Sequence, residues 1–213
     1  DEKSWMILDI TKPSFWKLEI LKENSKAGKL PQGLKDELSG NAGWVRTDYG
    51  EWYVEPVAHE GRVYIFGGGH VAKALVPVLA SVGFCCTVMD DREEFSSAER
   101  FPEAEKIITG DFSHISRYVS IRSWDYVCIM TRGHQYDYSV QKQVLALKPY
   151  YIGVMGSKRK IKTVTEKLLS DGFSRKEIES CHMPIGLKIQ AETPEEIAVS
   201  IAGELIFFRS LQK

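Results

Sequence analysis

The stretch VYIFGGGHVA, residues 63–72, decides the fold of this chain. Four consecutive apolar residues run directly into three glycines, and apolar residues at helical spacing follow over positions 71–82. Gly67, Gly69 and Ala72 form a G-x-G-x-x-A pattern, which permits a tight turn, a close backbone approach to a phosphate and tight helix–strand packing. A buried strand, a glycine turn and a helix in this order predict the first unit of a parallel sheet.

The same alternation of strands and helices continues toward the C-terminus. Further strands are predicted at 84–89, 106–109, 126–131 and 151–155, and helices around 71–82, 138–147, 158–169 and 175–180. Residues 187–190 are weakly strand-like. Thr193 as N-cap, Pro194 as first helical residue and Glu196 as the partner in a capping box predict the start of a last helix. We therefore expect an α/β domain over residues 59–213, with a parallel sheet and helices on both of its faces.

Residues 1–58 are predicted to form a small α+β segment. Partial helical patterning covers residues 14–39, and two short runs at 44–48 and 51–57 flank Tyr49-Gly50 as in a hairpin. The segment contains four of the five tryptophans. These are Trp5, Trp16, Trp44 and Trp52. They are expected either to form the interface of a homodimer or simply to cover the following domain.

Composition excludes several classes of protein. The 213 residues include 28 Lys and Arg against 29 Asp and Glu, and a net charge of -1 does not favour a nucleic-acid binder. The four cysteines form no CxxC pair, which is typical of buried free thiols in a reducing compartment. No apolar stretch reaches ~18 residues, so we expect a cytoplasmic protein without a membrane span.

Ligands of such sheets bind beyond the carboxyl ends of the strands, near the point where the strand order reverses. The first loop at this edge consists of Gly67, Gly68, Gly69 and His70. The start of the following helix offers unpaired N–H donors to an anion. Asp90 and Asp91 end the second strand, where an acidic residue would meet a ribose. A glycine turn needed only for packing and a solvated strand end are the alternatives.

The loop after the fourth strand contributes Arg132, Gly133 and His134 to the same edge. An arginine can bind a phosphate through two parallel hydrogen bonds, and a histidine can move protons near neutral pH. Asp137 also falls at this edge, and the alternative role for it is the N-cap of the helix that follows.

The loop after the fifth strand contributes Gly156, Ser157, Lys158 and Arg159. Together with Lys160, three cations fall in the first turn of a helix, where each opposes the helix dipole at a cost of ~0.3–1 kcal/mol. This cost suggests a bound anion, although a solvated basic turn remains the alternative.

His182 lies in a predicted loop. With His70 and His134 it would make a polar or metal-binding group if the fold brought the three rings together. Metal-ligand spacing is absent from the sequence, so we expect isolated, hydrogen-bonded histidines and no metal.

Seven ordered blocks give the chain a resemblance to a known family. They are VYIFGGGHVA (63–72), VMDDR (88–92), RFPEA (100–104), IMTRGHQYD (129–137), YIGVMGSKRK (151–160), HMPIGL (182–187) and AETPEEIAVSI (191–201). As a set they resemble the xanthine dehydrogenase accessory protein family (XdhC/CoxI). The resemblance implies a Rossmann-like domain and a part in the maturation of molybdenum hydroxylases.

Members of that family are understood to bind the molybdenum cofactor (molybdopterin), to protect it while its terminal sulfur is installed, and to pass it to a xanthine dehydrogenase-like apo-enzyme. The cofactor is a pyranopterin with a phosphate, which the glycine turn, Arg132, Lys158 and Arg159 would suit. Two departures stand out. The Cys-Ser-Gly-Gly type motif of the family's N-terminal domain is absent, and Gln190 replaces a usual glycine.

Two other functions remain open at this point. The loop from Gly67 to Ala72 and Asp90 also fit an oxidoreductase that uses NAD or NADP, although no substrate domain is recognisable. A nucleotide or redox sensor that acts only through a partner protein is the third possibility.

Overall fold

The computed structural model describes residues 4–22, 34, 42–56 and 61–212. The chain divides into two compact units, Asp1–His59 and Glu60–Gln212, and each is described by itself. None of the helices in the described part of the chain combines the length and apolarity that a membrane crossing requires.

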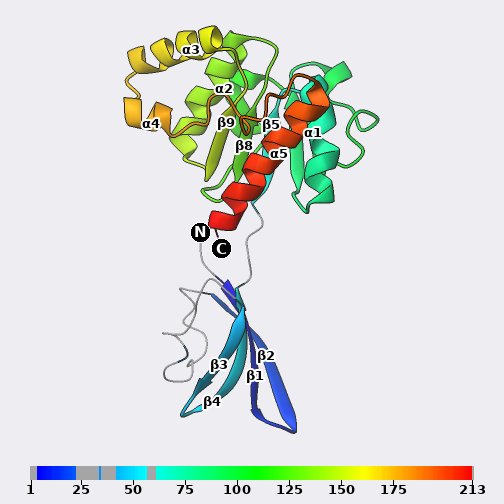
Figure 1. Ribbon diagram of the computed structural model, residues 1–213, viewed down its shortest axis with the longest axis vertical. Coiled ribbons are helices and arrows are strands. Elements are labelled where there is room, and N and C mark those ends of the chain that lie inside the picture. The colour runs from blue at the N-terminus through cyan, green and yellow to red at the C-terminus, as the bar shows by residue number, and fades with distance from the viewer. Residues whose placement is uncertain (1–3, 23–33, 35–41, 57–60, 213) are drawn as a thin grey trace. The chain divides into compact units, whose positions relative to one another are not determined.

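The second unit is built on a five-stranded parallel sheet. Its strands are β5 (Val63–Phe66), β6 (Cys86–Asp90), β7 (Lys106–Thr109), β8 (Tyr126–Ile129) and β9 (Tyr151–Val154). Their order across the sheet is β7-β6-β5-β8-β9, and β5, β8 and β9 are labelled in Figure 1. This confirms the predicted α/β class. The direction of winding reverses between β5 and β8, so the switch point lies at the end of the strand that precedes the three glycines.

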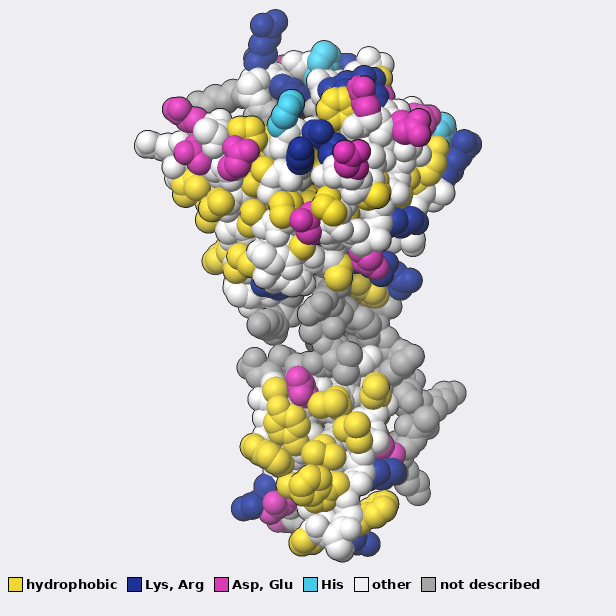
Figure 2. All heavy atoms as spheres, turned by 90° about the vertical axis from the view of Figure 1, so that its right-hand side faces the viewer, with side chains coloured by type: hydrophobic (Ala, Val, Ile, Leu, Met, Phe, Trp, Pro, Cys, Tyr) yellow, Lys and Arg dark blue, Asp and Glu magenta, His cyan; other side chains and the backbone are white. Residues whose placement is uncertain are grey.

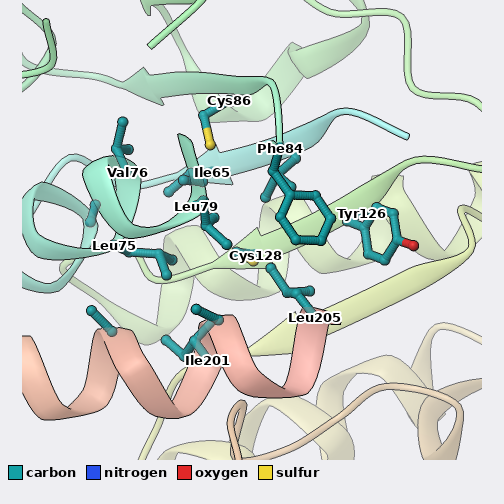
Figure 3. Packing of buried hydrophobic residues seen from close by; sticks show 14 of the residues in the cluster. Ile65, Leu75, Val76, Leu79, Phe84, Cys86, Tyr126, Cys128, Ile201 and Leu205 are labelled. Carbon is teal, nitrogen blue, oxygen red and sulfur yellow. The ribbon is translucent and has the colours of Figure 1, made fainter. Parts of the chain in front are cut away.

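Helices cover both faces of this sheet. They are α1 (His70–Ser81), α2 (His134–Leu147), α3 (Lys158–Ser170), α4 (Arg175–Glu179) and α5 (Pro194–Leu211), with 3-10 turns η2 (Glu93–Phe95) and η3 (Phe112–Arg117). On one face, α1 and α5 pack together over β5, β6 and β8, as Leu75, Leu79, Ile201 and Leu205 show in Figure 3. The other face carries α2, α3 and η3.

Strand β5 shows why the first four residues of VYIFGGGHVA are all apolar or aromatic. Val63 and Ile65 are buried against α1 and α5, whereas Tyr64 and Phe66 belong to the core on the opposite face. Because side chains alternate along a strand, a strand covered on both sides needs an apolar residue at every position.

The N-terminal unit is a four-stranded antiparallel sheet. It contains β1 (Ser4–Lys12), β2 (Phe15–Lys22), β3 (Gly43–Thr47) and β4 (Gly50–Pro56), in the order β2-β1-β4-β3. The hairpin predicted around Tyr49-Gly50 is confirmed. The predicted helical patterning is wrong for residues 15–22, which form β2 paired with β1; residues 23–33 and 35–39 lie outside the described part of the chain.

Three further predictions about local structure are wrong. Residues 187–190 form no strand. Helix α2 begins at His134, four residues before the predicted start, because Gly133 is its N-cap. Asp137 is therefore a helical residue in the first turn, and it is fully buried.

The cysteines follow the prediction with one exception. Cys86, Cys128 and Cys181 are buried and free, whereas Cys85 is exposed. Burial raises the pKa of the Cys86 thiol to about 12 and that of Cys181 to about 11. Buried protonated thiols of this kind behave as small apolar side chains rather than as nucleophiles.

Candidate anion site at the switch point

The three glycines after β5 have different roles. Gly67 has a φ of +109°, and a Cβ at this position would lie 2.4 Å from the carbonyl oxygen of Met130. Its N–H donates to the carbonyl of Met89, 2.8 Å away. Gly67 is therefore required by the left-handed turn and by the close approach of the β8 backbone.

Both backbone polar groups of Gly68 form hydrogen bonds, and its Cα lies close to another part of the backbone. Its N–H donates to Oδ2 of Asp90 at 2.8 Å, and its carbonyl accepts from Nε of Arg100 at 2.8 Å. A Cβ at Gly68 would lie 1.8 Å from the carbonyl oxygen of Phe95. This glycine fixes the loop and does not offer its N–H to a ligand.

Gly69 differs from its neighbours because open space lies in front of it. Apart from Gly69 itself and the neighbouring backbone, no heavy atom lies within 4 Å of the position its Cβ would take. Gly69 is the N-cap of α1 and supplies no side-chain hydrogen bond to the helix. Packing does not explain this glycine, whereas a ligand that approaches the start of α1 would.

The two helices at the switch point share this kind of start. Gly133 caps α2, again without a side-chain hydrogen bond, whereas hydroxyl groups of Ser157, Ser174 and Thr193 cap α3, α4 and α5. Since α1 follows β5 and α2 follows β8, both glycine-capped starts lie at the switch point. Their first N–H groups are a natural site for an anion.

Asp90 lies beneath this site. Its carboxylate is buried and accepts hydrogen bonds from the N–H of Gly68 and from the backbone and guanidinium of Arg92. Burial raises the pKa of Asp90, but the hydrogen bonds from Arg92 and Gly68 outweigh it, so the pKa lies below its usual value. Asp90 therefore orients Gly68 from within the loop through its carboxylate.

Asp91 and Arg132 close the outer side of the site. Nη2 of Arg132 lies 2.8 Å from Oδ2 of Asp91 and 3.2 Å from the hydroxyl of Tyr136. Asp91 follows β6 and Arg132 follows β8, so this ion pair spans the carboxyl end of β5 between them. The Arg132 side chain is about half exposed, so its guanidinium is accessible from solution.

A buried network supports Arg132 from below. Oδ1 of Asp137 accepts hydrogen bonds from the backbone N–H of Thr131 at 3.1 Å and from its hydroxyl at 2.5 Å. Oδ2 of Asp137 forms an ion pair with Lys160 on α3. Asp137 thereby ties the end of β8 to two helices and fixes the backbone that carries Arg132.

The basic start of α3 is only partly available to a ligand. Ser157 is its N-cap and accepts a hydrogen bond from the N–H of Lys160 at 3.4 Å, and Arg159 is exposed. Lys160 already has an anion within the protein, because its ammonium pairs with Asp137. The sequence suggested a bound anion because three cations lie in the first turn of this helix. The charge of Lys160 is already balanced by Asp137, so only Lys158 and Arg159 remain as candidates for binding an anion. Gly156 lies beside this start, where a Cβ would be 3.1 Å from the Lys160 side chain.

The structure does not bring the three histidines together. His70 and His134 are exposed first residues of α1 and α2 at the switch point. The ring of His182 instead stacks on Tyr151, the first residue of β9, with ring centroids 4.7 Å apart. Its Nδ1 lies 3.6 Å from the Glu204 carboxylate. Among the described residues no group of three His, Cys, Asp or Glu side chains is placed to hold a metal ion.

Sequence reasoning missed two arginines beside the glycine loop. Arg92 is held by Asp90, and its guanidinium lies 3.6 Å from the ring centroid of Phe95. Arg100 binds the Gly68 carbonyl, and its Nη2 is buried without a hydrogen-bond partner in the described structure. Arg100 lies in the RFPEA block quoted above, but its distance from the loop in sequence hid its contact with it.

This fold and site define a class of protein. A parallel sheet with a reversed winding direction, a glycine loop at the first βα turn and two glycine-capped helix starts make a Rossmann domain with a candidate anion site at its switch point. The family model of the XdhC Rossmann domain matches residues 63–205. The chain belongs to the XdhC family.

The relatives agree with this assignment. The chain is 27% identical over 191 residues to a Bacillus subtilis protein described as a probable xanthine dehydrogenase component, covering 88% of this chain and 56% of that protein. It is 29% identical over 146 residues to the Escherichia coli protein YqeB, which is uncharacterised, covering 68% of this chain and 27% of that protein.

A solved structure extends the likeness to both units. The crystal structure of a xanthine dehydrogenase from Bacillus halodurans superposes with a TM-score of 0.74 at 28% identity, covering 99% of this chain and 61% of that one. The chain therefore spans about a quarter to three fifths of the length of these relatives.

Proposed function

We propose that this protein assists the maturation of a xanthine dehydrogenase-type molybdenum hydroxylase by binding the molybdenum cofactor at the switch point. Membership of the XdhC family supports the maturation role. The observation that carries the cofactor-binding part is the open space at Gly69, in front of a helix start that no side chain caps. A phosphate is the group for which such a start is suited.

The residues around Gly69 fit a phosphate-bearing pterin. The starts of α1 and α2 offer N–H donors. The guanidinium of Arg132 already donates to Asp91 and has further N–H groups that can donate to a second anion. Nη2 of Arg100 is a buried donor beside the loop whose hydrogen bond is not satisfied within the described structure. This unsatisfied donor suits an anionic ligand.

Each of these residues has a separate part in the proposed binding. The helix starts hold the phosphate, Arg132 orients it, and Asp90 keeps Gly68 turned so that the path to Gly69 stays open. The exposed His70 and His134 stand beside the phosphate position as the first residues of the two helices. When bound, the cofactor supplies the molybdenum and its redox chemistry, which the hydroxylase receives.

The geometry does not favour the alternative of an NAD(P)-dependent oxidoreductase. A dinucleotide-binding domain presents free carboxylate oxygens to the ribose hydroxyls at the end of its second strand. Here Asp90 is 2% exposed and both of its oxygens accept hydrogen bonds from Gly68 and Arg92. A ribose would have to displace bonds that hold the glycine loop together.

Anaerobic titration of the protein with molybdenum cofactor, followed by calorimetry, tests the binding step. We expect saturable binding at one site per chain and no heat with NADH. Co-expression with a candidate hydroxylase tests the maturation step, with recovered activity only when the chain is present. An absence of binding and of any thermal stabilisation by the cofactor would refute the proposal.

Replacement of Arg132 by Gln should weaken cofactor binding by about 10- to 100-fold, the effect of losing a hydrogen bond to a charged group. Asp91→Asn should strengthen binding, because it removes the carboxylate with which the phosphate competes for Arg132. The calorimetric titration measures both effects. Arg175→Gln, which removes the same charge from an exposed position on α4, should leave the affinity unchanged. Equal losses of affinity in Arg132→Gln and Arg175→Gln would show that the net charge of the protein, and not a contact of Arg132, causes the effect.

A further inference from the structure

The N-terminal sheet has apolar side chains on both of its faces. One face is covered: Trp5, Ile7, Trp52 and Val54 pack with Leu34 into a small core. Residues that pair directly across antiparallel strands point to the same face, so the strand register also identifies the residues of the opposite face.

The opposite face carries a continuous apolar row across all four strands. Leu8 pairs with Leu18 on one side and with Tyr53 on the other, and Tyr53 pairs with Trp44. The rings of Trp44 and Tyr53 meet edge to face, with centroids 5.1 Å apart. Met6 and Ile20 form a second pair on this face, and Trp16 joins it by alternation along β2. We call these seven side chains the open face.

The open face leaves a large apolar area in contact with solvent. Trp16 is 66% exposed, Leu18 62%, Ile20 69% and Trp44 68%. These four side chains alone present about 600 Å², which is at the upper end of what monomeric proteins expose in one patch. A stable dimer interface covers about 800 Å² on each partner. Apolar side chains are gathered in one area of this unit's surface in Figure 2.

The charges on this face do not oppose self-association. Arg46 shares the face of Trp44 on β3, and Glu51 shares the face of Tyr53 on β4, and the two form an ion pair at 2.5 Å. Glu55 also lies on this face by the register. A face with a central apolar row, and with an internal ion pair among its few charges, suits an identical face, whereas a strongly charged partner would find little to pair with.

We propose that a second copy of this chain packs on the open face, so that two four-stranded sheets form a β-sandwich around it. Two sheets that bury one apolar face each against the other are a standard stable packing. This divides the tryptophans between two roles: Trp5 and Trp52 form the core of each sheet, and Trp16 and Trp44 form the interface. The inference does not depend on the proposed cofactor, because it concerns the other unit of the chain.

The oligomeric state of the whole chain tests this inference. Light scattering after size-exclusion chromatography should give a dimer for the wild type at micromolar concentration. Leu18→Lys should shift it to a monomer and raise the dissociation constant on the order of 100-fold, since it places a charge at the centre of the interface in both copies.

Phe15→Lys is the matched control. Phe15 is 67% exposed on the same strand, but alternation along β2 places it on the side away from Trp16 and Leu18. This variant should remain a dimer. Circular dichroism checks that both variants fold.

Tryptophan emission provides a second measurement. Dilution of the wild type should shift the emission to longer wavelength as Trp16 and Trp44 become exposed, and Leu18→Lys should show the shifted spectrum at every concentration. A monomeric wild type, a dimer that persists in Leu18→Lys, or equal effects of Leu18→Lys and Phe15→Lys would each overturn the inference.

Discussion

Gly68→Ala is expected to destabilise the Rossmann unit by at least ~4 kcal/mol, the range in which single substitutions disrupt a fold. The added Cβ would lie 1.8 Å from the carbonyl oxygen of Phe95. That carbonyl is backbone and cannot move aside as a flexible side chain would. Any shift of the loop also breaks the hydrogen bonds that Gly68 makes with Asp90 and Arg100. Thermal unfolding followed by circular dichroism measures the effect.

Gly69→Ala is the informative comparison, because it adds the same methyl group one residue further on. Its Cβ meets no atom within 4 Å, and its φ of −67° suits alanine. We expect a loss of stability within about 1 kcal/mol, the cost of a poorer N-cap. Cofactor binding, in contrast, should fall strongly, because the methyl group would occupy the space in front of α1. Normal binding by a folded Gly69→Ala protein would remove the central support for the proposed function.

The contrast between Gly68 and Gly69 shows how far sequence alone can reach. The pattern VYIFGGGHVA predicts the strand, the turn and the helix, because burial on both faces and a tight turn are local demands. The three consecutive glycines do not reveal from sequence which of them contacts other protein atoms and which faces open space. That distinction depends on Phe95 and Met130, which are brought to the loop by the tertiary fold.

Strand β2 illustrates an ambiguity within the local signal. The segment FWKLEILK has apolar residues at positions 15, 16, 18, 20 and 21, which fit a helical spacing as well as alternation. Pairing with β1 decides in favour of the strand. Pairing is a long-range property, so the pattern within residues 14–39 does not reveal it.

The sequence predicts correctly that the charged candidate residues lie at the carboxyl ends of the strands. The role of several of them depends on partners that are distant in sequence. Asp90 ends β6 as expected, yet its carboxylate turns inward to Gly68 and Arg92. His182 follows Cys181 in sequence, yet backbone bonds to Ile152 and Val154 carry it alongside β9, and its ring stacks on Tyr151. Such contacts cannot be read from spacing along the chain.

Asp137→Asn is expected to cost about 3 kcal/mol, the typical penalty for breaking a buried ion pair by removing one partner. Asn can still accept the hydrogen bonds from Thr131, but its amide no longer neutralises Lys160, whose side chain is only 24% exposed. Asp171→Asn is a control on the surface: it breaks a 2.8 Å pair with Lys142, which is half exposed, and should cost less than about 1 kcal/mol. Chemical denaturation of the two variants gives both values.

A double-mutant cycle with Lys160→Met identifies the cause of the loss. If the unpaired ammonium is responsible, Asp137→Asn should cost much less in the Lys160→Met background than in the wild type. Equal costs in the two backgrounds would show instead that the hydrogen bonds to Thr131 carry the effect. The pair also connects stability to the proposed site, since Thr131 directly precedes Arg132. Asp137→Asn should therefore weaken cofactor binding even under conditions in which the protein is fully folded, because the backbone that positions Arg132 loses its anchor to α3.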